Sequence, residues 1–130
     1  MKKLLIYAAA LMILMIVSPA DAYRVTLHNT TPYEIKVEVY GEHLFWNNEV
    51  DASMKVSKNT SGSCSLPGAI CIYRVKFSFS PLHPDNVDIY SYIKETVVSP
   101  SDDWGIACKD VTWRAVKDAA SKHEVYYIKE

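Results

Sequence analysis

Glycine, proline and cysteine are scarce in this chain of 130 residues, which contains four Gly, six Pro and three Cys. So little Gly and Pro excludes collagen-like repeats and long flexible linkers. An excess of one charge is also missing, because 14 basic and 15 acidic residues leave a formal net charge of −1. The sequence therefore gives no electrostatic reason to expect nucleic acid as a partner. A hydrophobic fraction of 49% excludes an intrinsically disordered chain, and the length fits one domain.

The one long apolar run lies at the N-terminus, where residues 4–17 carry no charge and follow Lys2 and Lys3. Ala20 and Ala22 then place small residues at the two positions that a signal peptidase reads. This order predicts a bacterial-type secretory signal peptide over residues 1–22, cleaved after Ala22, and a single domain over residues 23–130. The alternative, an uncleaved anchor, would need about 20 apolar residues to span a bilayer. We therefore expect a periplasmic or secreted protein with no membrane span after signal removal.

Alternation of apolar and polar side chains predicts two antiparallel strands. In residues 33–40, Ile35, Val37 and Val39 share one face, and in residues 71–79 the odd positions are apolar. Weaker strand patterns occupy residues 23–27, 53–57, 87–98, 111–116 and 125–128. Turn residues separate them at 28–32, 59–62, 66–68, 80–86 and 99–103.

Residues 111–120 fit either a strand or a short helix capped by Asp110, and we prefer the strand because Val111, Trp113 and Ala115 then share one side. About six to eight short strands predict an all-β fold, a small antiparallel β-sandwich or partly open barrel.

The three cysteines are Cys64, Cys71 and Cys108, and in an oxidising compartment two of them are expected to pair. We predict a Cys64–Cys108 disulfide, because it would join two loops and leave Cys71 buried on the apolar face of its strand. The sequence leaves the other two pairings open. Because no Cys-x-x-Cys motif occurs, the cysteines are expected to be structural rather than catalytic.

The sequence contains no metal-ligand spacing, phosphate-binding loop, dinucleotide fingerprint or EF-hand, so we expect no metal and no cofactor. The four histidines are far apart in the chain: His28, His43, His83 and His123. No Gly-x-Ser-x-Gly motif occurs, and the Ser-Gly-Ser of residues 61–63 is expected in a turn. We therefore expect no enzyme. The alternative is a small hydrolase that uses His83, Asp85 or the Asp102-Asp103 pair.

Aromatic residues are plentiful, with three Trp, three Phe and nine Tyr, of which only Tyr7 lies in the signal peptide. Trp46 and Trp104 fall in expected loops, and Tyr90 and Tyr92 share one face of an expected strand. Exposed Tyr and Trp provide large contact areas in protein and glycan recognition. We therefore predict an exported binding protein that recognises a protein or glycan through Trp46, Tyr90, Tyr92 and Trp104. An envelope-active toxin or an enzyme inhibitor remains an alternative.

Overall fold

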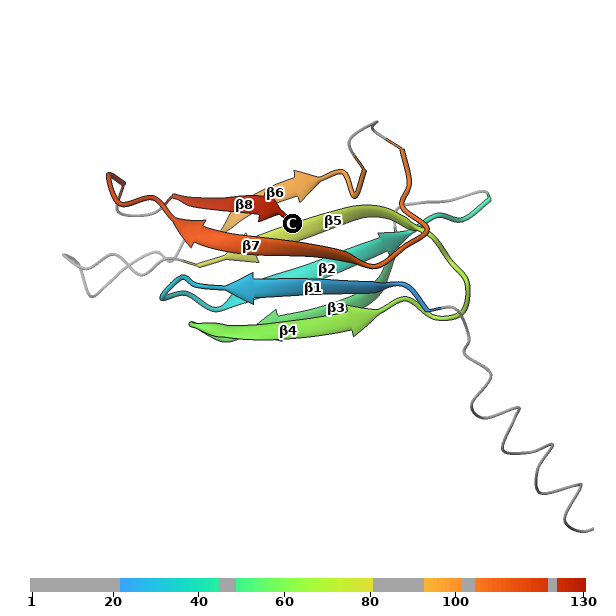
Figure 1. Ribbon diagram of the computed structural model, residues 1–130, viewed down its shortest axis with the longest axis horizontal. Coiled ribbons are helices and arrows are strands. Elements are labelled where there is room, and N and C mark those ends of the chain that lie inside the picture. The colour runs from blue at the N-terminus through green and yellow to red at the C-terminus, as the bar shows by residue number, and fades with distance from the viewer. Residues whose placement is uncertain (1–21, 45–48, 81–92, 102–104, 122–123) are drawn as a thin grey trace, which may run out of the picture.

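The computed structural model describes residues 22–44, 49–80, 93–101, 105–121 and 124–130, and contains eight strands in these segments (Figure 1). The strands are β1 (Arg24–Asn29), β2 (Ile35–Gly41), β3 (Val50–Val56), β4 (Thr60–Ser65), β5 (Ile72–Phe79), β6 (Lys94–Val98), β7 (Val111–Lys117) and β8 (Val125–Lys129). They form two four-stranded sheets of order β4-β1-β7-β8 and β3-β2-β5-β6, which face each other. The predicted all-β sandwich is confirmed.

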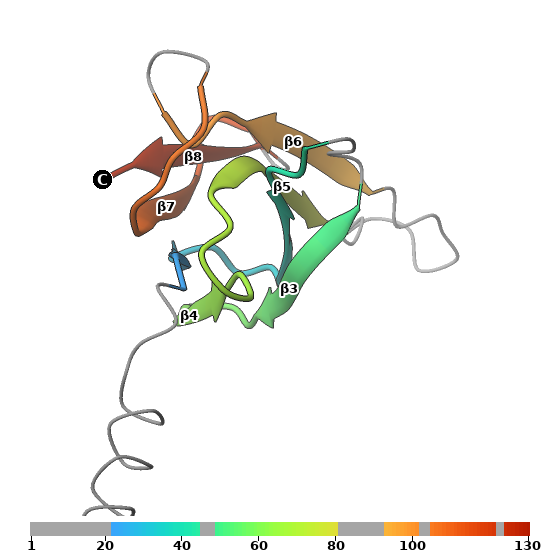
Figure 2. The same cartoon turned by 90° about the vertical axis from the view of Figure 1, so that its right-hand side faces the viewer.

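The two long sides of the sandwich differ (Figure 2). On one side, β3 and β4 lie next to each other, and a tight turn over residues 57–60 carries the chain from one sheet to the other. The amide of Thr60 donates to the carbonyl of Ser57 in this turn, and Asn59 takes a positive φ of 54°. On the opposite side lie β6 and β8, the edge strands of their sheets among the described residues. We call this the open side.

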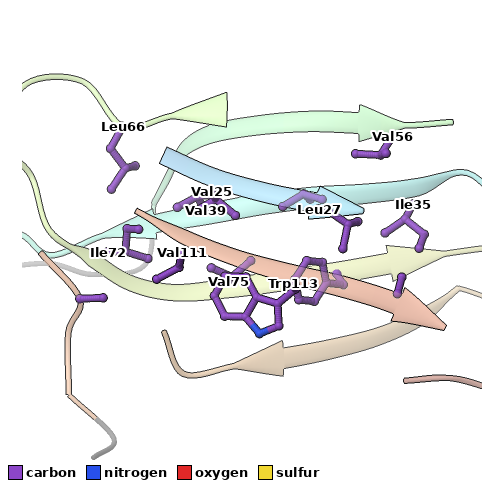
Figure 3. Packing of buried hydrophobic residues seen from close by; sticks show 14 of the residues in the cluster. Val25, Leu27, Ile35, Val39, Val56, Leu66, Ile72, Val75, Val111 and Trp113 are labelled. Atoms are coloured by element: carbon purple, nitrogen blue, oxygen red, sulfur yellow. The ribbon is translucent and has the colours of Figure 1, made fainter. Parts of the chain in front are cut away.

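The core lies between the sheets and follows the predicted alternation (Figure 3). Its buried members come from strands of both sheets, with Leu66 and Ala107 added from the connecting segments: Val25, Leu27, Ile35, Val37, Val39, Val56, Leu66, Ile72, Val75, Phe77, Phe79, Ala107, Val111, Trp113 and Ala115. Phe77 is central, because its ring packs edge-on against Trp113 and stacks on Tyr127 with ring centroids 4.2 Å apart. Burial of each large apolar side chain contributes about 1.5–3 kcal/mol.

A buried polar corner joins the sheets where β1 leads into β2. The side-chain amide of Asn29 donates to the carbonyls of Tyr33, Val56 and Ser57, and its oxygen accepts from the amide and hydroxyl of Thr31. Asn29 and Thr31 are almost fully buried. Because these bonds satisfy buried groups of β1, of the following loop and of β3, the corner fixes how the two sheets meet.

Several strand predictions are confirmed, and the predicted ends of others are wrong. Strand β7 takes the place of the alternative helix, with Val111, Trp113 and Ala115 buried on one side. Strand β1 continues to Asn29 through residues expected to form a turn, and β3 extends beyond the predicted residues 53–57 at its N-terminal end. Of the predicted strand at 87–98, residues 87–92 lie outside the described segments, and β6 covers the rest from Lys94.

The predicted inward face of residues 71–79 is correct only from Val75 onward. Tyr40 pairs with Arg74 and Gly41 with Ile72, so Tyr73 is an extra residue opposite β2. Such a bulge reverses the order of inward and outward side chains. Ile72 is therefore buried, whereas Tyr73 is only partly buried.

The predicted Cys64–Cys108 disulfide is wrong, because the structure pairs Cys71 with Cys108. Backbone hydrogen bonds in both directions between Ile72 and Ala107 hold the neighbouring cysteines together, with Cα atoms 4.5 Å apart. Cys64 belongs to β4, a strand that the sequence analysis missed, and pairs in register with the buried Val25. Its thiol is free and partly buried, and this burial raises its pKa. A single disulfide is thus present as expected, but Cys108 pairs with Cys71 instead of Cys64.

Candidate functional site

The predicted binding residues Trp46, Tyr90, Tyr92 and Trp104 lie outside the described residues. The same holds for the alternative hydrolytic residues His83, Asp85, Asp102 and Asp103. The predicted aromatic surface therefore stays a prediction.

Both edge strands of the open side carry exposed apolar side chains, which by register lie on the outer faces of their own sheets. Ile93 and Val97, at and beside β6, are 64% and 61% exposed, and Tyr126 and Ile128 of β8 are 53% and 54% exposed. The remaining large exposed apolar residues of the described segments are Leu44, Val50 and Ile106. Exposed apolar side chains on an edge strand are typical of surfaces that pair with another chain.

The backbone of β8 offers hydrogen-bonding groups along this side. The amide of Glu130 donates to Thr112 of the β7 side, and the amide of Asp118 donates to Glu124. Because hydrogen-bonded residues alternate in an antiparallel pair, the even-numbered residues of β8 bond to β7. The amides and carbonyls of Val125 and Tyr127 therefore point toward the open edge.

A groove of about 340 Å³ runs beside these edges. It is lined by Phe79, Lys94, Glu95, Thr96, Glu124, Val125 and Tyr126. The groove thus has apolar walls from both sheets and charges of both signs, which fits a polypeptide better than a ligand of one charge.

The outer face of the β4-β1-β7-β8 sheet is polar and rich in hydroxyl groups over β4 and β1. Thr26 and Ser63 share a hydrogen bond of 2.8 Å between their hydroxyls, and His28 Nδ1 and Ser61 Oγ lie 2.7 Å apart. Sequence analysis placed Ser61 in a turn, and the alternating serines of β4 were the signal that could have identified the strand. Register places Arg114 of β7 beside His28.

A shallow pocket of about 280 Å³ lies at one end of this face, lined by His28, Asn29, Thr30, Asn59, Thr60, Ser61 and Arg114. Beside the pocket, Arg114 Nε donates to a carboxylate oxygen of Glu130. This hydrogen bond, and then the positive charge of Arg114, lower the pKa of Glu130. Because Glu130 contacts Arg114 rather than orienting the His28 ring, the Ser61–His28 pair lacks the third group of a hydrolytic triad within the described structure.

On the outer face of the β3-β2-β5-β6 sheet, positive and negative side chains pair with each other. Lys76 lies 3.4 Å from Glu38 and 3.8 Å from Glu95, and Lys36 lies 3.8 Å from Glu38. Exposed ion pairs of this kind contribute little to stability and leave no strong field of one sign. This face is a weaker candidate for binding than the open side or the polar pocket.

His43 has a structural contact. Its Nε2 lies 2.8 Å from Asp51 Oδ2, which also accepts from the amide of Gly41. Asp51 is the extra residue where β3 bulges against β2, so the contact fixes the end of that hairpin. Among the described residues, no group of three or more His, Cys, Asp or Glu side chains is placed to hold a metal ion.

Fold and surface define a small all-β sandwich with one disulfide, an open sheet side and a polar pocket. Comparison with protein families, with characterised proteins and with solved structures finds no match. In the part of the chain that the structure describes, no helix has the length and apolar character needed to cross a membrane. A structural disulfide is compatible with a periplasmic or extracellular protein.

Proposed function

We propose that this protein is exported by its signal peptide and binds another protein by accepting an extended segment of that partner along β8. The observation that carries the proposal is the position of β8 at the end of its sheet among the described residues, where Val125 and Tyr127 direct backbone groups away from β7. A peptide that adds a strand to such an edge gains affinity from main-chain hydrogen bonds and specificity from side-chain contacts.

The side chains beside this edge support a protein partner over a glycan. Tyr126 and Ile128 offer exposed apolar contacts two residues apart on the outward face of β8. An added strand would place alternate side chains against these contacts and into the groove between β6 and β8. A glycan would satisfy few of the backbone groups along the edge.

The charged residues of the open side favour a different protein over a second copy of this chain. By register, Lys94 of β6 and Lys129 of β8 take inward-facing positions at the two edges. Inward-facing charges on an edge strand oppose an added strand that does not neutralise them, and a different protein can supply the carboxylates that a second copy's own lysines cannot. The Cys71–Cys108 disulfide supports the export half of the proposal.

The test uses peptides selected from a random displayed library on the oxidised protein, residues 23–130. We expect the selected peptides to slow hydrogen exchange of the Val125 and Tyr127 amides, because these would donate to the added strand. Val125→Pro removes one outward N–H without touching the bonds to β7, and should weaken peptide binding about tenfold or more. Val125→Thr is the matched control, because it changes the side chain and keeps the amide.

Three results would contradict the proposal. The peptides could protect the amides of β3 or β4 instead, or Val125→Thr could weaken binding as much as Val125→Pro. Dimers whose β8 amides are protected without peptide would identify a second copy as the occupant.

A further inference from the structure

The polar pocket on the β4-β1-β7-β8 sheet is separate from the open side and is not used by the proposed function. Its lining contains two side chains that can carry positive charge, His28 and Arg114, and otherwise uncharged polar residues. The lining residues include no carboxylate, but the Glu130 carboxylate lies beside the pocket on Arg114 and would have to be displaced or shared by an anion. Its volume of about 280 Å³ equals that of roughly nine molecules of liquid water, which is room for a small charged group and part of its carrier.

Arg114 has further hydrogen-bond donors that a ligand could use. Its Nε–H is used by Glu130, and the two Nη atoms of a guanidinium carry four further N–H donors. Arg114 is about half exposed, so a ligand can reach it from solvent. The Arg114–Glu130 contact shows that this guanidinium already binds an oxyanion from the chain itself.

His28 is oriented by its neighbour on β4. The contact of Nδ1 with Ser61 Oγ fixes the ring plane and leaves Nε2 on the opposite edge of the ring. Parallel pairing of β1 with β7 places His28 directly beside Arg114. The turn over residues 57–60, in which Asn59 has a positive φ, brings Asn59 and Thr60 to the rim of the same pocket.

We infer that this pocket binds a tetrahedral oxyanion, phosphate or sulfate, with Arg114 as the charged donor and His28, Ser61, Thr60 and Asn59 as further hydrogen-bonding partners. Charge-assisted hydrogen bonds from arginine to such groups are among the stronger polar contacts in proteins. The group can be a free ion or an ester on a sugar, since both present the same oxygens.

The test is a titration of the oxidised protein, residues 23–130, with inorganic phosphate at low ionic strength, followed by the amide NMR signals of Asn59, Thr60 and Ser61. We expect saturable shifts of these signals. Arg114→Gln and His28→Gln should each weaken binding, Arg114→Gln by about tenfold or more. Arg24→Gln is the matched control, because Arg24 lies on the same face of β1 as His28 and carries the same charge as Arg114.

Further ligands distinguish the sources of the oxyanion. Tighter binding of glucose 6-phosphate than of inorganic phosphate would identify a phosphorylated sugar, and equal affinities would identify the free ion. Binding of glucose as tight as that of glucose 6-phosphate would overturn the inference, because the charged group would then contribute nothing.

Two other outcomes would also overturn it. Equal losses in Arg24→Gln and Arg114→Gln would mean attraction by overall charge, and shifts confined to amides outside the pocket would mean another site. Val125→Pro should leave phosphate binding unchanged, so failure of the proposed function and failure of this inference can be told apart.

Discussion

The phenol of Tyr127 lies between the sheets with its ring stacked on Phe77, and its hydroxyl is buried without a hydrogen-bond partner among the described residues. A buried polar group without a partner costs about 1–3 kcal/mol relative to its hydrated state. The ring therefore stabilises the core, whereas the hydroxyl opposes folding. Burial also raises the pKa of Tyr127 above the ordinary tyrosine value.

Tyr127→Phe keeps the stacked ring and removes the unsatisfied hydroxyl. We expect it to raise the free energy of unfolding by about 1 kcal/mol at pH 8, measured by urea denaturation. In the unfolded chain tyrosine loses its proton near pH 10, whereas in the folded protein the raised pKa keeps Tyr127 protonated. Stability that is intact below about pH 10 should therefore be lost as the pH rises above it.

The part of this alkaline loss that comes from Tyr127 should be missing in Tyr127→Phe, so the stability gain of the variant should grow between pH 8 and pH 10.5. A variant less stable than the wild type at pH 8 would show that the hydroxyl has a partner.

At the scale of elements, strands were predictable where one face is large and apolar. Strand β2 alternates Ile35, Val37 and Val39 with charged residues, and the core buries the three apolar side chains as expected. Strand β4 was missed because its inward residues include Gly62, which carries no side chain. A Cβ atom at Gly62 would lie 3.0 Å from a methyl group of Val56, which is closer than most side-chain contacts.

The error in the disulfide has the same origin. Because β4 was interpreted as a turn, Cys64 was expected in a loop from which it could pair with Cys108. Because the bulge at Tyr73 was not predicted, the alternation placed the side chain of Cys71 in the core. Neither a bulge nor the bridge between Ile72 and Ala107 has a signal in the spacing of apolar residues. Both depend on contacts between segments far apart in the sequence.

Removal of the Cys71–Cys108 disulfide should destabilise the fold strongly. The cysteines are 37 residues apart. Closing a loop of that size lowers the entropy of the unfolded chain and so stabilises the folded protein by about 4 kcal/mol. We expect Cys71→Ser with Cys108→Ser to lower the urea midpoint to that of the reduced wild-type protein. Cys64→Ser is the control and should cost about 1 kcal/mol, because it changes one partly buried thiol. An equal loss in the control and in the double variant would mean that Cys64 takes part in the pairing.

At the scale of the whole molecule, the two candidate sites were beyond prediction from sequence for a common reason. The polar pocket joins His28, Ser61 and Arg114 from three strands, and it exists only because β1 pairs in parallel with β7 and antiparallel with β4. The open side likewise depends on which strands end the two sheets. Alternation identifies strands and their inward faces, but the order of strands in a sheet is decided by packing of the whole chain.

The first residue after the expected cleavage site, Tyr23, already contacts the rest of the domain. The carbonyl of Tyr23 accepts a hydrogen bond from the amide of Leu66, and Tyr23 packs against the core immediately before β1. Cleavage after Ala22 would keep this contact, whereas cleavage one residue later would remove it. We therefore expect the protein purified from the envelope fraction of its own host to have the intact mass of residues 23–130 less two hydrogens.

Alkylation should distinguish the single free thiol in the same sample. Because burial raises the pKa of Cys64 and limits access to it, labelling at pH 8 should be slow in the folded protein and complete after unfolding, with one label per chain. A mass that includes residues 1–22 would contradict export by cleavage. Three labels on the unfolded, unreduced chain would mean that the disulfide does not form in the host. The proposed location of the protein in an oxidising compartment would then be wrong.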